Sequence, residues 1–141
     1  MALLTECLFF IGVRECSAFQ EVIYQRAMAI EMEDAELKFS REHEMPIYYK
    51  RQQIGTRRVD FLVEDVVSLE IKAVTLLEDV HLAQAKNYLE AYDLEVGLLI
   101  NFGAKSLQQK RLINKKFKQA NQGNPEIKNR QADESNINGI I

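Results

Sequence analysis

Residues 57–72 read RRVDFLVEDVVSLEIK, and this stretch decides the fold of the 141-residue chain. Its β-branched and apolar residues predict two strands, residues 57–64 and 66–74, that pair as a hairpin. Asp60, Glu70 and Lys72 interrupt the apolar pattern. A carboxylate in such a setting costs free energy unless another group compensates its charge. The hairpin therefore predicts a functional site as well as part of a core.

The register of the hairpin decides whether the two carboxylates meet. Glu70 and Lys72 are two residues apart, so they share one face of their strand. A loop of odd length around Asp65 places Asp60 directly across from Glu70, whereas a two-residue loop places Asp60 opposite Leu69. A divalent metal would compensate both carboxylates, and a metal beside a lysine is a known means of hydrolysing phosphodiesters. The register is therefore a testable requirement of a metal site.

A long helix is expected before the hairpin, at residues 18–37. Two apolar stripes run along it at helical spacing. One stripe contains Phe19, Val22, Ile23, Ala27 and Ile30, and the other contains Tyr24, Met28, Met32 and Ala35. A helix that is apolar on two sides is expected to pack between layers. Glu21 heads the second stripe, so its carboxylate is expected to lie beside buried residues.

The segment between this helix and the hairpin has strand character. Residues 37–41 and 47–49 are β-like, Pro46 interrupts them, and Gly55 predicts a turn before the hairpin. The expected order up to this point is therefore one helix and three strands.

The segment after the hairpin continues the alternation. Residues 78–92 predict a second helix, with His81, Gln84 and Tyr88 on one stripe. Residues 96–102 form an apolar run typical of a strand covered on both faces. Residues 106–113 fit strand and helix equally well. The whole pattern predicts an α/β domain with a mixed sheet and helices packed on it.

Composition indicates one soluble domain. Hydrophobic residues make up 47% of the chain and charged residues 28%, which is ordinary for a globular protein. We expect a single domain at residues 1–118 and a disordered polar tail at 119–141. The apolar run at residues 8–13 is too short to span a membrane and is expected to be a buried helix or strand. Cys7 and Cys16 stand without a metal-binding pattern, which argues against zinc and favours a reduced, cytoplasmic setting.

Charge is unevenly distributed along the chain. The net charge is −3, yet residues 104–141 contain eight basic and three acidic residues. Residues 1–103 contain ten basic and eighteen acidic residues. The basic stretch could meet a phosphate backbone or could simply be a solvated surface, and the sequence favours neither reading.

Four segments resemble the GxxExxY protein family, which is placed in the PD-(D/E)XK nuclease superfamily. They are FQEVIY at residues 19–24, GTRRVDF at 55–61, LEIKA at 69–73 and GLLINFG at 97–103. The resemblance covers about residues 18–117. Ala18 stands where the family motif begins with glycine, and residues 1–17 match the family poorly.

The resemblance implies a restriction-endonuclease-like fold, with an α-β-β-β-α-β core and a mixed central sheet flanked by helices. It implies cleavage of nucleic-acid phosphodiester bonds, with DNA as the expected partner, no membrane, and Mg²⁺ as the cofactor, for which Mn²⁺ can substitute. Asp60 and Glu70 would be the metal ligands. Lys72 would orient or activate the attacking water, and Glu21 would add an acidic residue from the helix.

The same resemblance extends to the second helix. Gln84 and Tyr88 match a Gln-x-x-x-Tyr motif in which the glutamine helps to order the site, and Tyr88 is also a candidate for contact with substrate. Arg57 and Arg58 either contact phosphate or merely flank their strand.

Other readings stay open. Glu70 and Lys72 could form an exposed ion pair that contributes little. Gln84 and Tyr88 could be ordinary helix packing, and His81 a surface histidine near the site. The domain could also be a catalytically inactive module that binds nucleic acid or supports assembly, because fold does not fix function. A homodimer is compatible with either function.

Overall fold

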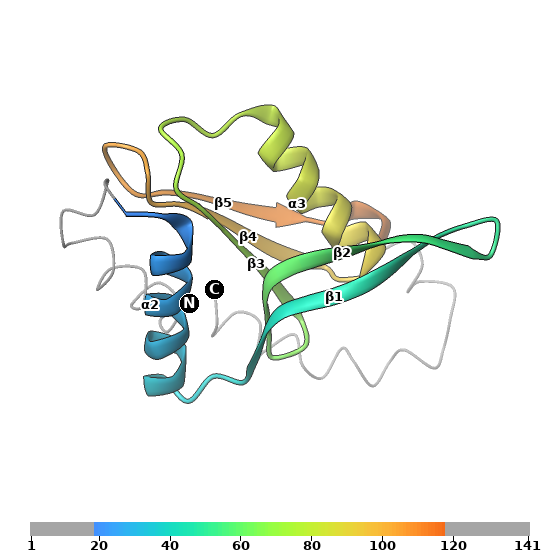
Figure 1. Ribbon diagram of the computed structural model, residues 1–141, viewed down its shortest axis with the longest axis horizontal. Helices are drawn as coiled ribbons and strands as arrows, with labels where there is room; N and C mark the ends of the chain where they lie inside the picture. The colour runs from blue at the N-terminus through green and yellow to red at the C-terminus, as the bar shows by residue number, and fades with distance from the viewer. Residues whose placement is uncertain (1–18, 118–141) are drawn as a thin grey trace.

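A computed structural model describes residues 19–117 of the chain (Figure 1). The elements follow one another as helix, three strands, helix and two strands. They are α2 (Glu21–Asp34), β1 (Phe39–Tyr49), β2 (Gln52–Val63), β3 (Val67–Lys72), α3 (Asp79–Ala91), β4 (Val96–Asn101) and β5 (Gln108–Ile113). The expected α-β-β-β-α-β order is confirmed, and β5 resolves the ambiguous segment as a strand. The predicted tail at 119–141, the apolar run at 8–13 and both cysteines lie outside the described residues.

One mixed five-stranded sheet, in the order β1-β2-β3-β4-β5, forms the centre of the domain. Only β3 and β4 pair in parallel, and α3 makes the crossover between them. All six residues of β4 are buried, as predicted for a strand covered on both faces.

The two helices cover opposite faces of the sheet. Leu98 and Ile100 of β4 belong to the same core cluster as the buried residues of α2. Leu99, between them, belongs to a second cluster with Ala85 and Leu89 of α3. Since successive side chains of a strand point to opposite faces, this alternation defines a helix–sheet–helix sandwich.

The prediction that α2 packs between layers is wrong. The stripe with Tyr24, Met28 and Met32 is buried as expected. The other stripe is exposed, with Phe19 at 54% and Ile30 at 57% of their full accessible surface. The helix is also shorter than predicted at both ends. Among residues 19–117 a single sheet lies beside α2, and it covers only one of the two apolar stripes.

Two further predictions about the first strands are wrong. Pro46 does not interrupt β1, which runs through it and pairs Pro46 with Thr56. Gly55 is not a turn but a strand residue of β2, and the turn lies at Lys50 and Arg51. Proline is tolerated here because β1 is an edge strand, where an N–H can face solvent.

The register of the second hairpin meets the requirement derived from sequence. Val63 pairs with Val67, so three residues form the loop, and Phe61 pairs with Leu69. Continuing this register by one residue places Asp60 across from Glu70. Glu64 and Asp65 in the loop have positive φ angles of 51° and 58°, which allow the chain to reverse in three residues.

Gly97 allows α3 to approach the sheet closely. A Cβ atom at this position would lie 2.7 Å from Ser68 Oγ and 2.8 Å from Leu89 Cδ2. Any larger residue would push α3 away from the sheet. Within residues 19–117, no helix has the length and apolar character needed to cross a membrane.

Candidate active site

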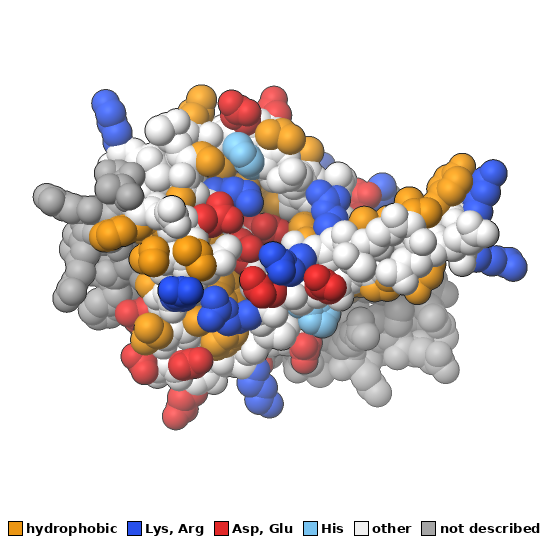
Figure 2. All heavy atoms as spheres, in the orientation of Figure 1, with side chains coloured by type: hydrophobic (Ala, Val, Ile, Leu, Met, Phe, Trp, Pro, Cys, Tyr) orange, Lys and Arg blue, Asp and Glu red, His pale blue; other side chains and the backbone are white. Residues whose placement is uncertain are grey.

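Three elements contribute four residues to one charged cluster near the carboxyl end of β3. Glu21 is the first residue of α2, Asp60 lies on β2, and Glu70 and Lys72 lie on β3. Figure 2 shows acidic and basic side chains gathered in the middle of one face of the molecule. The alternating pattern of β3 turns Glu70 and Lys72 away from the side on which Leu69 and Ile71 join the α2 core.

Lys72 links two of the carboxylates. Its Nζ atom lies 4.0 Å from Glu70 Oε2 and 4.0 Å from Glu21 Oε1. The Lys72 side chain is 20% exposed and that of Glu70 is 10% exposed. The reading of Glu70 and Lys72 as an exposed ion pair is therefore wrong, because the pair lies largely away from solvent. Glu21 lies 49 residues before Glu70 and 51 before Lys72 in the sequence, so it joins the cluster only through the tertiary fold.

Asp60 is held by two hydrogen bonds. The backbone N–H of Ile71 donates to Asp60 Oδ2 at 2.8 Å, where β2 separates from β3. The side-chain amide of Gln25 donates to Asp60 Oδ1 at 3.0 Å. Gln25 was not predicted from sequence. Its only signal is its position four residues after Glu21, which places both side chains on the same side of α2.

Glu70 carries the strongest electrostatic perturbation of the cluster. Burial raises its pKa from 4.5 to about 8, the neighbouring Asp60 carboxylate adds to the rise, and Lys72 opposes it. Glu70 Oε1 is buried and has no hydrogen-bond partner among the described residues. Glu70 therefore tends to hold a proton near neutral pH unless a cation joins it.

The other two carboxylates shift in the same direction. Burial raises the pKa of Asp60, opposed by the N–H of Ile71, by Lys72 and by Gln25. Burial also raises the pKa of Glu21, and Lys72 again opposes the rise. Three carboxylates share one lysine, so negative charge exceeds positive charge among these four side chains.

An aromatic and basic group borders the cluster on the α3 side. The guanidinium of Arg57 lies over the ring of Tyr88, with 4.9 Å between Cζ and the ring centroid. Tyr88 is buried, and burial together with the nearby Glu70 charge raises the pKa of its phenol. The charges of Arg57 and Arg58 oppose the pKa rise of Glu70 and Asp60 respectively. Both arginines therefore lie within electrostatic reach of the cluster.

Gln84 and His81 lie on the same helix stripe as Tyr88. Gln84 is exposed and makes no hydrogen bond to the acidic cluster within residues 19–117. Its ordering role therefore stays a prediction. His81 Nδ1 accepts a hydrogen bond from the N–H of Glu78 at the start of α3. Its charge lowers the pKa of Glu21 slightly, which places His81 near the rim of the cluster.

Asn101, on the neighbouring strand β4, supports the end of β3. Its side chain is fully buried, and its Cα is the register partner of Lys72. Oδ1 accepts hydrogen bonds from the N–H groups of Val74 and Gly103, and Nδ2 donates to Val74 O and Gln108 Oε1. These four bonds fix the chain immediately after Lys72. Sequence patterns did not single out Asn101.

The residues present fit a divalent cation. Asp60 and Glu70 offer carboxylate oxygens, the ligands that Mg²⁺ prefers, and the partnerless Glu70 Oε1 is available to a cation. Among residues 19–117, however, no three His, Cys, Asp or Glu side chains form a ready-made metal cluster. Asp60 and Glu70 are the two candidate ligands, and solvent or substrate oxygens would complete the coordination of a bound cation.

Comparison with known families gives one match. A family model described as the PD-(D/E)XK nuclease superfamily matches residues 3–113, which is most of the chain. No curated protein matches the sequence. The finer resemblance to GxxExxY proteins stays a prediction within this superfamily.

A solved structure supports the fold. It is described as "Crystal structure of SSO0001", and it superposes with a TM-score of 0.56 at 18% sequence identity. The alignment covers 78% of this chain and 57% of the other chain, so this chain spans little more than half the length of that protein. Together with the order of the elements, this likeness shows a restriction-endonuclease-like fold.

Proposed function

Because this chain belongs to the PD-(D/E)XK nuclease superfamily, we propose that it is a metal-dependent nuclease that hydrolyses phosphodiester bonds in DNA. The observation that carries the proposal is the buried Glu70 oxygen beside Asp60 and Lys72, which has no hydrogen-bond partner within residues 19–117. A buried carboxylate cluster with too little positive charge is unfavourable in the protein alone. A divalent cation would compensate this negative charge.

Each residue has a role that follows from its surroundings. Asp60 and Glu70 would hold Mg²⁺, or Mn²⁺ in its place. Gln25 and the N–H of Ile71 keep the Asp60 carboxylate in one orientation. A bound divalent cation supplies a Lewis acid that polarises a phosphoryl oxygen and favours ionisation of water.

Lys72 and Glu21 act on the attacking water. The Lys72 ammonium lies between Glu70 and Glu21 and can donate a hydrogen bond to a water molecule or to the charge that develops on phosphate. Glu21 holds Lys72 from the other side, so the ammonium is positioned before substrate arrives. Arg57 and Arg58 would contact the phosphate backbone, and Tyr88 supports Arg57.

A cleavage assay tests the proposal. The purified protein should cut plasmid DNA or labelled duplex DNA in Mg²⁺ or Mn²⁺ and should stop in EDTA. We expect Asp60→Asn, Glu70→Gln and Lys72→Met each to lower the rate by about 100-fold or more. Single-stranded DNA and RNA of the same sequence measure the preference for duplex DNA.

Matched variants control for charge and for folding. Glu33→Gln changes an exposed carboxylate of α2, and Lys86→Met changes an exposed lysine of α3. Both should cut at the wild-type rate. If Asp60→Asn and Glu70→Gln cut as fast as these controls, the assignment of the site is wrong.

Two observations favour a second function. Both oxygens of Asp60 already accept hydrogen bonds from the protein, and residues 19–117 hold no ready-made cluster of three metal ligands. A catalytically inactive module that binds nucleic acid would show the same features. Calorimetric titration with Mn²⁺ separates the two functions: a binding site that disappears in Asp60→Ala argues for the nuclease. No heat of binding in the wild type argues for the inactive module.

The proposed setting of the protein is the cytoplasm. Its two cysteines, Cys7 and Cys16, lack partners in a recognisable disulfide or zinc pattern in the sequence.

A further inference from the structure

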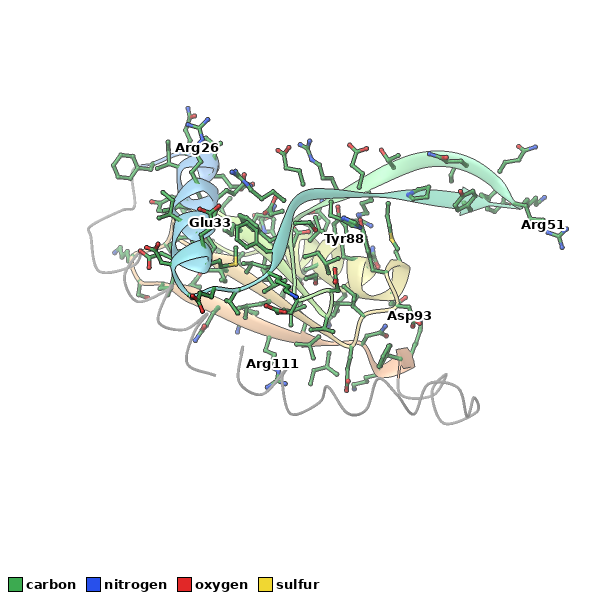
Figure 3. All side chains as sticks on the ribbon, turned by 90° about the horizontal axis from the view of Figure 1, so that it is seen from below. Arg26, Glu33, Arg51, Tyr88, Asp93 and Arg111 are labelled. Carbon is green, nitrogen blue, oxygen red and sulfur yellow. The ribbon has the colours of Figure 1, made fainter. Side chains whose placement is uncertain are left out.

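We infer that the free end of the β1–β2 hairpin is a DNA-binding arm that inserts into the major groove of duplex DNA. The inference rests on the proposed function, because it takes a nucleic acid as the partner. The arm is defined as residues 45–58, which include the turn. Figures 1 and 3 show that it extends away from the rest of the sheet, with Arg51 at its far end.

The arm is a two-stranded ribbon that stands clear of the sheet. β2 pairs with β3 only from Phe61 to Val63. Before Phe61, β2 has a ladder partner only in β1. Residues 46–56 are exposed throughout. An isolated two-stranded hairpin is marginally stable in water, so such an extension needs support at its base.

Tyr92 provides this support. Its hydroxyl donates to His43 O at 2.9 Å and lies 3.3 Å from Arg57 O, so it contacts both strands at the base of the arm. Its ring packs near the rings of His43 and Tyr88. Burial is the main cause that raises the pKa of Tyr92 to about 12, and the nearby Glu70 charge adds to it. The hydroxyl therefore keeps its proton. The arm is thus held in a fixed direction relative to α3 and the acidic cluster.

The charge of the arm is opposite to that of the chain. Residues 45–58 contain four basic residues and no acidic residue, although the chain has a net charge of −3. Arg58 forms an exposed ion pair with Glu42 at 3.7 Å. Lys50 and Arg51 at the turn have no carboxylate partner among the described residues. The tip of the arm therefore presents free positive charge of the kind that meets phosphate.

The turn contains residues that its backbone geometry disfavours. Lys50 and Arg51 have φ angles of 47° and 66° and lie between the paired Tyr49 and Gln52. A two-residue turn with both φ angles positive favours Asn-Gly, because larger side chains are strained there. The turn therefore carries two long cations at positions where they cost stability, which points to a function for their charge.

Aromatic and apolar side chains accompany these cations. Tyr48, Tyr49 and Ile54 are 62%, 61% and 66% exposed, and Lys50 Nζ lies 5.5 Å from the centre of the Tyr49 ring. Figure 2 shows apolar and basic side chains together at the far end of the arm. Such a surface can contact the sugar and methyl groups in a groove while the cations meet the phosphates on either side.

The dimensions also agree with duplex DNA. The major groove of B-DNA is about 12 Å wide and admits a two-stranded β-ribbon. The arm has five residues on β1 and seven on β2, on either side of its two-residue turn, which gives it a length of about 17–23 Å. The major groove of A-form RNA is too deep and narrow to admit it.

A second copy of the chain is a poorer occupant. Pairing between arms would need an open strand edge, but Pro46 on β1 has no N–H to donate. The register of β1 and β2 also shifts between Ile47 and Tyr48. Proline and irregularities of this kind oppose edge-to-edge pairing.

Fluorescence anisotropy with a fluorescein-labelled 20-base-pair DNA duplex, measured in EDTA on the full chain, tests the arm without cleavage. The test variant is Lys50→Asn/Arg51→Gly, which removes both cations and installs the turn sequence that the backbone favours. We expect its dissociation constant to rise about tenfold and the slope of log K against log salt to fall by about 2. Its urea midpoint should be no lower than that of the wild type.

The matched control is Lys110→Gln/Arg111→Gln, which removes one exposed lysine and one exposed arginine from β5, at the other edge of the sheet; Figure 3 labels Arg111. It should bind the duplex like the wild type. The inference would be overturned if both variants lost the same affinity for the DNA duplex, or if the arm variant lost none. Equal losses on a labelled RNA duplex would overturn the assignment to the DNA major groove.

Two measurements separate the arm from the proposed function and from a membrane. If the wild type binds DNA through the arm but never cuts it in Mg²⁺, the arm stands and the nuclease proposal fails. If the wild type cuts DNA and the arm variant binds normally, the nuclease stands and the arm inference fails. Sedimentation with vesicles of phosphatidylserine and phosphatidylcholine should show the same vesicle binding for the wild type and the arm variant. If the arm variant loses binding to vesicles but not to DNA, the inference is overturned.

Discussion

Replacement of Glu70 by glutamine should change how stability depends on pH. In the metal-free protein, burial raises the pKa of Glu70 from 4.5 to about 8. Glutamine has the shape of the protonated carboxyl group but cannot ionise. We therefore expect Glu70→Gln to exceed the wild-type free energy of unfolding by about 1 kcal/mol near pH 5 and by about 4 kcal/mol near pH 8.

The sign follows from proton binding. Between pH 4.5 and pH 8 the native protein keeps a proton on Glu70 that the unfolded chain releases, so native stability falls as pH rises. Since one pKa unit corresponds to about 1.4 kcal/mol, the cost is about 1 kcal/mol at pH 5 and about 4 kcal/mol at pH 8. The wild type should thus lose about 3 kcal/mol across this window through Glu70. Such a loss is a large part of the stability of an ordinary domain.

Urea unfolding in EDTA, followed by circular dichroism at pH 5, 6, 7 and 8, measures this difference. Glu33→Gln, which removes an exposed carboxylate of α2 (Figure 3), is the control and should follow the wild-type curve. The reasoning is refuted if the curves of Glu70→Gln and wild type stay parallel from pH 5 to pH 8. Glu70 would then be ionised in the native protein without a metal.

Two further predictions concern residues that support the site. Gln25→Leu removes the hydrogen bond to Asp60 Oδ1, and we expect calorimetry to show about tenfold weaker Mn²⁺ binding, with a change in unfolding free energy of only about 1 kcal/mol. Asn101→Ala leaves the N–H groups of Val74 and Gly103 without their acceptor. It should cost about 2–4 kcal/mol in urea unfolding, whereas the exposed Asn87→Ala should cost less than about 0.5 kcal/mol. Wild-type metal affinity in Gln25→Leu, or equal stability of the two asparagine variants, would contradict these expectations.

Local sequence patterns predicted most of the elements correctly. The apolar run at residues 96–102 and the second helix are confirmed, because burial on both faces and a repeat of three to four residues leave direct signals in sequence. Pro46 and Gly55 were misread as interruptions. Both residues lie in the arm, where β1 and β2 pair only with each other and the usual constraints of a central strand do not apply.

The residues that support the site left weaker signals. Gln25 lies 35 residues before Asp60, and the spacing of polar residues along a helix does not predict a hydrogen bond to a residue so distant in sequence. Asn101 ends an apolar strand and reads as an ordinary boundary residue. Its four hydrogen bonds depend on how the segments after β3 and β4 meet.

The sequence alone determined that Asp60, Glu70 and Lys72 share a hairpin, because strand alternation leaves a local signal. It left the loop length open, and the structure shows the three-residue loop whose register sets Asp60 across from Glu70. Only the tertiary structure decided that Glu21 joins Lys72 and that Glu70 is buried with one oxygen lacking a partner among the described residues. The burial of Glu70 and its electrostatic interactions with Asp60, Lys72 and Glu21 arise from elements that are distant in sequence. The pKa of Glu70 therefore depends on the packing of α2, β2 and α3 around β3 rather than on its neighbours along the chain.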